Sequence, residues 1–221
     1  MATNTSLDDL LNGGIECSAI TNIYGPPGSG KTNLCLLAAV ACVKTGRKVL
    51  FVDTEGGFSI ERLRQIAEID LSKVLVLEPK TFEEQSKLMR KLSEVVKKEG
   101  IGLVIVDSIV ALYRLELGTD NYLELSRELA NQLALLSKIA REEEIPILIT
   151  NQIYSNVDTG KVELSGKSVV KWWSKCLIEL QRIDNSRRLA IIRKHRSIPE
   201  GKELEFEIVE KGIKTGKFHL F

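Results

Sequence analysis

Residues 25–32 read Gly-Pro-Pro-Gly-Ser-Gly-Lys-Thr, and this pattern restricts the fold more than any other feature of the chain. Its glycines let the backbone turn tightly and approach a phosphate, so that the N–H groups of the loop point inward as an anion-binding nest. A strand is predicted before the pattern over Ala19–Tyr24. A helix is predicted after it over Thr32–Lys44, and its positive N-terminal end adds to the attraction for phosphate. The pattern therefore predicts a strand–loop–helix unit that binds nucleotide phosphates, and the alternative, a glycine turn that binds nothing, is weaker in this context.

The side chains of the loop have separate expected roles. Lys31 is expected to reach the β- and γ-phosphates of ATP, and the Thr32 hydroxyl to take one coordination position of Mg²⁺. The predicted nucleotide-binding residues in and after the loop are Gly25, Pro26, Pro27, Gly28, Ser29, Gly30, Lys31, Thr32 and Asn33.

Polar residues end three other predicted strands, and the carboxyl ends of parallel strands meet at one ligand crevice. Asp107 follows the apolar strand Leu103–Val106 and is a candidate Mg²⁺ ligand through water. Glu55 is a candidate for orienting or deprotonating the attacking water, and Gln152 for sensing the γ-phosphate. A helix-capping acid or surface ion pair for Glu55, and a loop position for Gln152, are the alternatives.

Short apolar runs alternate with longer amphipathic segments through most of the chain, which favours a parallel sheet with helices on both faces. After residue 176 the pattern changes to paired strands, which favours an antiparallel extension. We therefore predict one α/β domain over residues 1–221, with a mainly parallel central sheet flanked by helices and antiparallel C-terminal strands. The other predicted helices are Ser59–Ile69, Thr81–Lys98 and Tyr122–Glu144; the other strands are Lys48–Val52, Val74–Leu77, Pro146–Thr150, Lys175–Ile183, Arg187–Arg193, Leu204–Val209 and Lys217–Leu220.

Charge and cysteine content exclude several kinds of protein. The chain has 31 Lys and Arg against 30 Asp and Glu, so any anionic partner must be met by a local patch. Its four cysteines form no C-x-x-C pair, which argues against a zinc site and for a reducing compartment. We find no signal peptide, and no stretch reaches the roughly 18 apolar residues of a membrane helix. A cytoplasmic protein without a membrane partner is expected.

Two segments near the C-terminal third are candidates for contact with DNA. Arg193, Lys194, His195 and Arg196 are consecutive basic side chains that can neutralise phosphates, although strand alternation sends some of them to opposite faces and a solvated strand end is the alternative. In the pair Trp172-Trp173, one ring is expected to be partly exposed and the other in the core. An exposed ring can stack on single-stranded bases, but core packing is favoured.

Four stretches together resemble the RecA/RadA recombinase superfamily: residues 13–34, 49–63, 103–114 and 147–153, with a fifth match over 197–213. Within it, the chain looks like the RadB family, the short archaeal paralogues of RadA. As in those proteins, we expect it to begin almost directly at a RecA-like ATPase core, without a helical N-terminal DNA-binding domain.

The resemblance implies roles for individual positions. Lys31 and Thr32 match the phosphate- and Mg²⁺-binding pair, and Asp107 the acid that supports the metal. Glu55 matches the catalytic glutamate. Gln152 matches the residue that couples the γ-phosphate to a DNA-binding loop. Arg62 matches a position that lies against adenine, and the segment Arg193–Arg196 resembles a DNA-contacting patch.

The function implied by the resemblance is an accessory role in homologous recombination and DNA repair after DNA damage. Such a protein binds ATP with Mg²⁺ and single-stranded or branched DNA, hydrolyses ATP weakly at most, and assists a RadA-like recombinase. A DNA-junction nuclease is a further candidate partner, and a homodimer fits better than a long filament.

Two departures from the family pattern argue against strand exchange by this chain alone. The loop Leu115–Asp120 is short and acidic, and Ile153–Ser168 is short with Lys161 and Lys167 as its basic residues. Two other functions stay open: a P-loop kinase, although no arginine-bearing lid insertion is visible, and a protein-interaction module that ATP switches between two states.

Overall fold

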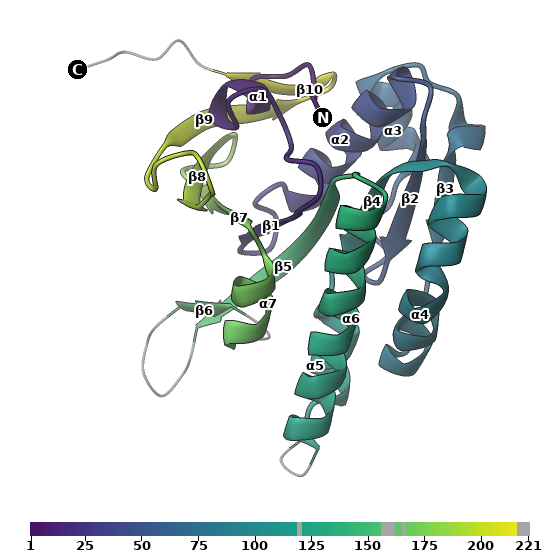
Figure 1. Cartoon of the computed structure of the whole chain (residues 1–221). Coiled ribbons are helices and arrows are strands. Elements are labelled where there is room, and N and C mark those ends of the chain that lie inside the picture. The colour runs from purple at the N-terminus through teal and green to yellow at the C-terminus, as the bar shows by residue number, and fades with distance from the viewer. Residues whose placement is uncertain (119–120, 156–161, 165–166, 216–221) are drawn as a thin grey trace.

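The computed structural model describes residues 1–118, 121–155, 162–164 and 167–215, and ten strands in these ranges form one sheet. The strands are β1 (Ile20–Gly25), β2 (Lys48–Asp53), β3 (Val74–Leu77), β4 (Ile101–Asp107), β5 (Ile147–Ser155), β6 (Val162–Leu164), β7 (Cys176–Arg182), β8 (Arg187–Lys194), β9 (Glu203–Val209) and β10 (Gly212–Thr215). Their order across the sheet is β10-β9-β8-β7-β1-β5-β4-β2-β3, with β6 paired to β5 off this path (Figure 1). The strands from β3 to β7 in this order run parallel, and those from β7 to β10 run antiparallel.

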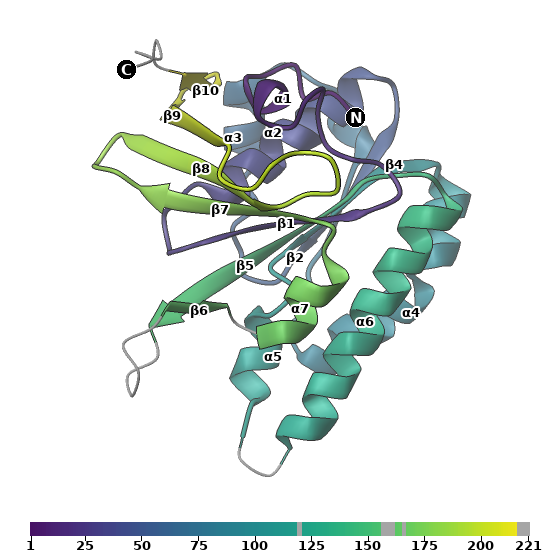
Figure 2. The same cartoon turned by 60° about the vertical axis from the view of Figure 1, so that its left-hand side comes forward.

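Helices cover both faces of the parallel part, as the two views in Figures 1 and 2 show. The helices are α1 (Leu7–Leu10), α2 (Lys31–Lys44), α3 (Ile60–Ile66), α4 (Phe82–Glu99), α5 (Ala111–Glu116), α6 (Tyr122–Glu142) and α7 (Lys167–Trp173), with a 3₁₀ turn η1 (Leu71–Lys73). Side chains of β4 alternate between two hydrophobic cores: Leu103 and Ile105 face the core of α2, and Val104 and Val106 the core of α4 and α6. The chain therefore has the predicted RecA-like α/β fold.

The long helices begin and end where local chemistry dictates. The Thr81 hydroxyl accepts a hydrogen bond from the Glu84 backbone N–H at 3.1 Å, which caps the N-terminus of α4. Gly100 takes a left-handed conformation with φ of +64° and ends the same helix. The sequence prediction for this helix was therefore accurate to one residue at each end.

Two predictions about elements need correction. The predicted helix Ser59–Ile69 stops at Ile66, where Ala67 turns to extended backbone. The strand paired with β9 is β10, because Gly212, with φ of +115°, lets the chain return at once and pair with Val209. The predicted strand Lys217–Leu220 lies outside the described residues. The short elements α1, α5, α7 and β6 were missed, since they hold too few residues for a periodic pattern.

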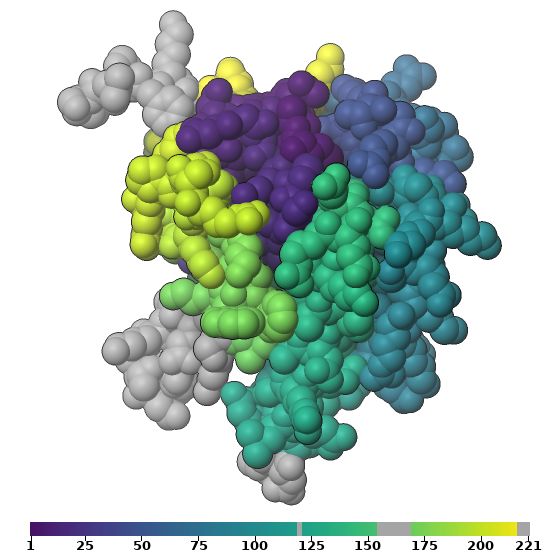
Figure 3. All heavy atoms as spheres, in the orientation of Figure 1, coloured from purple at the N-terminus to yellow at the C-terminus, as the bar shows by residue number. Residues whose placement is uncertain are grey.

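The N-terminal segment packs against the C-terminal strands, and Figure 3 shows the two ends of the colour range side by side on one face. The Lys202 ammonium donates to the Asn12 side-chain oxygen at 2.6 Å and to the Asp9 carbonyl. These contacts attach the N-terminal segment to the turn that leads into β9. Within the described ranges, none of the helices combines the length and the apolar character needed to cross a lipid bilayer.

Candidate nucleotide site

A cavity of about 370 Å³ opens where β1, β4 and β5 end and the glycine loop leads into α2. Nine of its ten lining residues are residues that the sequence analysis singled out, and the tenth, Ile208, belongs to β9. The lining residues are Pro27, Gly28, Gly30, Lys31, Thr32, Asn33, Glu55, Asp107, Gln152 and Ile208. Gly25, Pro26 and Ser29 belong to the same loop but do not line the cavity.

Glycine is required in the loop by packing as well as by the expected ligand. A Cβ on Gly25 would lie 2.3 Å from the Leu180 carbonyl oxygen of β7, a distance that only a shift of backbone could relieve. Gly30 has φ of +101°, and a Cβ there would lie 2.9 Å from Ile208 Cδ1. The antiparallel extension therefore presses directly on the loop.

Lys31 is a buried cation at the centre of the loop, with 8% of its surface exposed. Its ammonium donates hydrogen bonds to the carbonyls of Gly25 at 3.1 Å and Pro26 at 3.0 Å. Burial lowers the pKa of Lys31, while the nearby carboxylates of Glu55 and Asp107 oppose that shift. An anion entering the cavity would stabilise the charged form of Lys31.

Glu55 is held at both of its carboxylate oxygens. The Ser108 hydroxyl donates to Oε1 at 2.7 Å, and the Gln152 amide donates to Oε2 at 2.7 Å. The ends of β2, β4 and β5 thus meet at one carboxylate, as parallel strands predict. The predicted water-activating residue, Glu55, and the predicted γ-phosphate sensor, Gln152, are therefore in direct contact.

Asp107 is a nearly fully buried acid, with 3% of its surface exposed. Its carboxylate accepts hydrogen bonds from the hydroxyls of Thr150 and Thr32. Burial raises the pKa of Asp107, and these hydrogen bonds oppose the shift. A cation beside Asp107 would stabilise its charged carboxylate form. Carboxylate oxygens are ligands that Mg²⁺ prefers.

The site fits a nucleotide with Mg²⁺ but not a metal held by protein ligands alone. In the described ranges, no group of three or more His, Cys, Asp or Glu side chains could hold a metal ion. A Mg²⁺ ion would therefore take the Thr32 hydroxyl and Asp107 as protein partners and fill its other positions with phosphate and water. Asn33 Nδ2 and Ser29 Oγ are buried without a hydrogen-bond partner in the described part of the chain, so the loop region retains polar groups with unused hydrogen-bonding capacity.

Asp53 is a structural residue of the site that the sequence analysis did not assign. Its Oδ1 accepts from the N–H groups of Glu55 at 3.1 Å, Gly56 at 2.8 Å and Gly57 at 3.1 Å, and its Oδ2 from Phe58 at 2.9 Å. One buried carboxylate therefore shapes the turn that presents Glu55. The sequence feature that could have indicated this role is an acid, Asp53, followed three and four residues later by the glycines Gly56 and Gly57.

Replacing Asp53 with alanine is expected to lower the free energy of unfolding by about 3 kcal/mol, because four N–H groups lose a charged acceptor. Asp53→Asn keeps one acceptor oxygen and should lose less. Urea denaturation of both variants measures the difference. Equal stability of Asp53→Ala and the wild type would show that the turn forms without this carboxylate.

Arg62 lies beside the cavity but does not line it. Its guanidinium donates to Asn33 Oδ1 at 2.9 Å and to the carbonyls of Val209 at 2.7 Å and Glu210 at 2.9 Å. Arg62 therefore connects α2 and α3 to the β9–β10 turn. The adenine contact implied by the resemblance stays a prediction.

The basic segment at the end of β8 is largely engaged within the chain. Arg193 pairs with Glu179 at 2.6 Å, and Arg196 pairs with Glu16 at 2.8 Å. Lys194 donates to two backbone carbonyls near the end of α7, and His195 Nδ1 accepts from the Ser197 N–H. These contacts leave less free positive charge than four consecutive basic residues suggest.

The β7–β8 ladder shifts register within this segment, because Ile178 pairs with Ile192 while Leu177 pairs with Lys194. Arg193 is therefore an extra residue in β8, and the strict alternation of side chains between the two faces of the strand ends there.

Arg193 also belongs to a polar cluster with Glu179 and Tyr24. Burial, and to a smaller extent the charge of Glu179, raise the pKa of Tyr24 to about 12. Arg193, Glu179 and Tyr24 thus form a polar cluster one residue before the phosphate loop.

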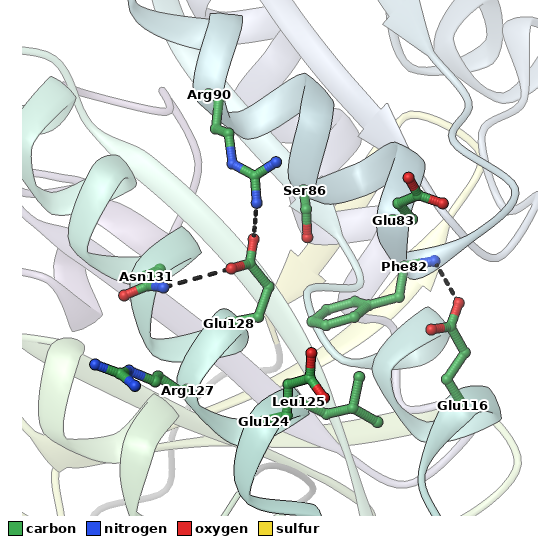
Figure 4. A pocket seen from close by; sticks show the side chains of 10 residues that line it. All are labelled: Phe82, Glu83, Ser86, Arg90, Glu116, Glu124, Leu125, Arg127, Glu128 and Asn131. Atoms are coloured by element: carbon green, nitrogen blue, oxygen red, sulfur yellow. Dashed lines mark hydrogen bonds and ion pairs between the residues drawn. The ribbon is translucent and has the colours of Figure 1, made fainter. Parts of the chain in front are cut away.

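A second cavity of about 340 Å³ lies between α4, α5 and α6 (Figure 4). Four glutamates and two arginines line it, and Arg90 is already paired with Glu128 at 2.8 Å. This excess of carboxylates disfavours a triphosphate. The loop cavity, with its amides and Lys31, is the better nucleotide site.

Comparison with known proteins places this geometry in a family. The Rad51 family matches residues 1–216. The chain is 42% identical over 221 residues to the "DNA repair and recombination protein RadB" of Methanobrevibacter smithii, covering 96% of this chain and 94% of that protein. It is 43% identical over 219 residues to the protein of the same description from Methanosphaera stadtmanae, with the same shares covered.

A solved structure supports the same assignment. The crystal structure of the RadB recombinase superposes with a TM-score of 0.82 at 34% sequence identity, covering 98% of this chain and 99% of that one. Both the sequence and the arrangement of the elements thus agree over nearly the full length. The chain belongs to the Rad51 family and, within it, to the RadB proteins of DNA repair and recombination.

Proposed function

We propose that this chain is a single-domain, ATP-dependent accessory protein of homologous recombination, with ATP and Mg²⁺ bound in the loop cavity. The observation that carries the proposal is the meeting of Lys31, Asp107 and the Glu55–Gln152 pair at one cavity. Membership of the family supports the role in DNA repair, and the residues that line the cavity support ATP binding.

Each residue has a proposed part in the chemistry. Lys31 and the loop amides bind the phosphate oxygens, and Thr32 and Asp107 hold Mg²⁺, which neutralises charge on the phosphates. Glu55, fixed at both oxygens, orients water for attack on the γ-phosphate, and Gln152 reports the state of that site through its hydrogen bond to Glu55.

Hydrolysis is expected to be slow. Lys31 is the one cation among the described residues that line the cavity, so the charge that develops in the transition state meets little further stabilisation. A neighbouring recombinase subunit could supply a second cation. Slow turnover therefore fits an accessory protein better than an independent kinase.

We further propose that the protein binds single-stranded or branched DNA through the basic surface at and around Arg193–Arg196, where β8 ends. In this role it assists a RadA-like recombinase. It would not perform strand exchange alone. A DNA-junction nuclease is a second candidate partner, and a homodimer is favoured over a long filament. The relatives' shared description as DNA repair and recombination proteins supports this role.

DNA binding over a salt series, with and without ATP and Mg²⁺, tests the DNA part of the proposal. We expect the logarithm of the affinity to fall linearly with the logarithm of the salt concentration, as phosphate contacts require. Phosphate release with and without single-stranded DNA should be measured in parallel. Absence of DNA binding at low salt, or transfer of phosphate to a small molecule, would contradict the proposal and favour the interaction-module or kinase alternatives.

A further inference from the structure

An exposed tryptophan lies at the end of α7, on a surface that the nucleotide site does not use. The Trp172 side chain is 67% exposed, and its ring meets the ring of Trp173 edge-on, with 5.0 Å between centroids. Trp173 is partly buried and packs against the core of α4 and α6. The Trp172 indole is therefore supported by Trp173 and largely exposed to solvent, so a large apolar side chain is left in contact with water.

Two lysines are neighbours of this ring, one in space and one along the chain. Lys175 Nζ lies over one part of the Trp172 ring, 6.0 Å from its centre, and Lys171 precedes Trp172 on α7. Both lysines are exposed, and neither forms an ion pair within the described ranges. We call Lys171, Trp172 and Lys175 the Trp172 surface. It combines an aromatic face with free positive charge.

Lys194 supports this surface from behind. Its ammonium donates to the carbonyls of Lys171 at 3.1 Å and Ser174 at 2.7 Å, at the C-terminal end of α7. Burial lowers the pKa of Lys194, and the charges of Lys175 and Lys171 lower it further. Lys194, one of the four basic residues named as candidates for DNA contact, thus holds the end of α7 in place. The lysines that form no ion pair in the described ranges are Lys171 and Lys175, next to Trp172.

The Trp172 surface lies at the opposite end of the strands from the ATP cavity. The Lys175 N–H donates to the carbonyl of Ile20, the first residue of β1, whereas the phosphate loop follows the last residue of that strand. The separation along β1 is about 17 Å, from roughly 3.3 Å per residue. A ligand on this surface would therefore not touch a bound nucleotide.

We propose that single-stranded DNA binds the Trp172 surface, with a base stacked on the indole of Trp172 and the flanking phosphates against Lys171 and Lys175. This inference rests on the proposed DNA binding and specifies where and in what form the DNA binds. Bases of a duplex are already stacked on each other, so the surface selects single strands. Lys194 acts as a positioning residue that fixes the end of α7.

The test is the binding of fluorescein-labelled oligo(dT), about 16 nucleotides long, to single-site variants. Trp172→Ala should weaken binding about tenfold or more, with Trp172→Phe retaining most of the affinity, because loss of one stacked base has roughly this effect. Leu123→Ala, which truncates a side chain that is 81% exposed on α6, is the matched control and should change nothing. A duplex of equal length should bind more weakly and be insensitive to Trp172→Ala.

Salt dependence separates direct phosphate contacts from positioning. Lys171→Gln and Lys175→Gln should each reduce the salt slope by roughly 0.7, the value for one single-strand phosphate contact. Lys98→Gln, an exposed lysine on α4, is the charge control. Lys194→Gln should weaken binding without changing the slope, and a reduced slope would show that Lys194 contacts phosphate itself.

Fluorescence gives an independent readout, because the chain has only two tryptophans. In Trp173→Phe, oligo(dT) should quench the emission of the remaining Trp172, whereas in Trp172→Phe the emission should stay constant. If the wild type binds oligo(dT) and Trp172→Ala binds it equally well, this inference is wrong while the proposed DNA binding stands. If Trp172→Ala alters self-association only, the surface binds a second copy, and if the wild type binds no DNA, both proposals fall.

Discussion

Lys31→Ala is expected to weaken ATP binding by at least about a hundredfold, which corresponds to roughly 3 kcal/mol. Lys31 is the cation of the cavity wall and carries the charge that the triphosphate needs, while the loop amides alone give uncharged hydrogen bonds. Isothermal titration with a non-hydrolysable ATP analogue and Mg²⁺ measures the loss.

The control for Lys31→Ala must separate lost binding from a disturbed loop, since the Lys31 ammonium also donates to the carbonyls of Gly25 and Pro26. Lys44→Ala, at the exposed last turn of the same helix, removes a lysine without touching the cavity. Comparable unfolding curves for both variants would show that the fold persists. Unchanged nucleotide affinity in folded Lys31→Ala would refute the phosphate site.

Glu55→Gln is expected to abolish most ATP hydrolysis while leaving ATP affinity nearly unchanged. A glutamine keeps a hydrogen bond to the Ser108 hydroxyl but cannot accept the proton of the attacking water. General-base catalysis contributes about 10²- to 10⁴-fold, so the rate should fall by at least about a hundredfold. Single-turnover phosphate release at saturating ATP measures this rate even when the wild type is slow.

Glu61→Gln is the matched control for Glu55→Gln, because Glu61 is an exposed acid in the first turn of α3. It should hydrolyse ATP at the wild-type rate. A wild-type rate in Glu55→Gln would mean that Glu55 serves only to join β4 and β5 through Ser108 and Gln152.

The sequence predicted the parallel core because each of its elements is long enough to carry its own pattern. Leu103–Val106 in β4 are all apolar, which fits burial on both faces, and α4 carries its cap at Thr81 and its stop at Gly100. Short elements such as α1 and α7 have no comparable pattern. The position of β10 depended on a single conformational feature, the positive φ of Gly212.

The site was predictable where residue types carry the chemistry and not where distant contacts decide it. Lys31, Asp107 and Glu55 stand at strand ends that a parallel sheet must bring together. The pairing of Arg196 with Glu16 spans most of the chain, and no local pattern announces it. The same is true of Lys194, whose ammonium reaches the carbonyls of α7 rather than facing solvent.

A crystal structure with a non-hydrolysable ATP analogue and Mg²⁺ tests the central claim most directly. We expect the triphosphate in the loop between β1 and α2, with the Lys31 ammonium on the β- and γ-phosphates and the metal beside Thr32 and Asp107. The nucleotide in the cavity between α4, α5 and α6, or an unchanged loop with Lys31 still bonded to the Gly25 and Pro26 carbonyls at saturating ligand, would contradict the account.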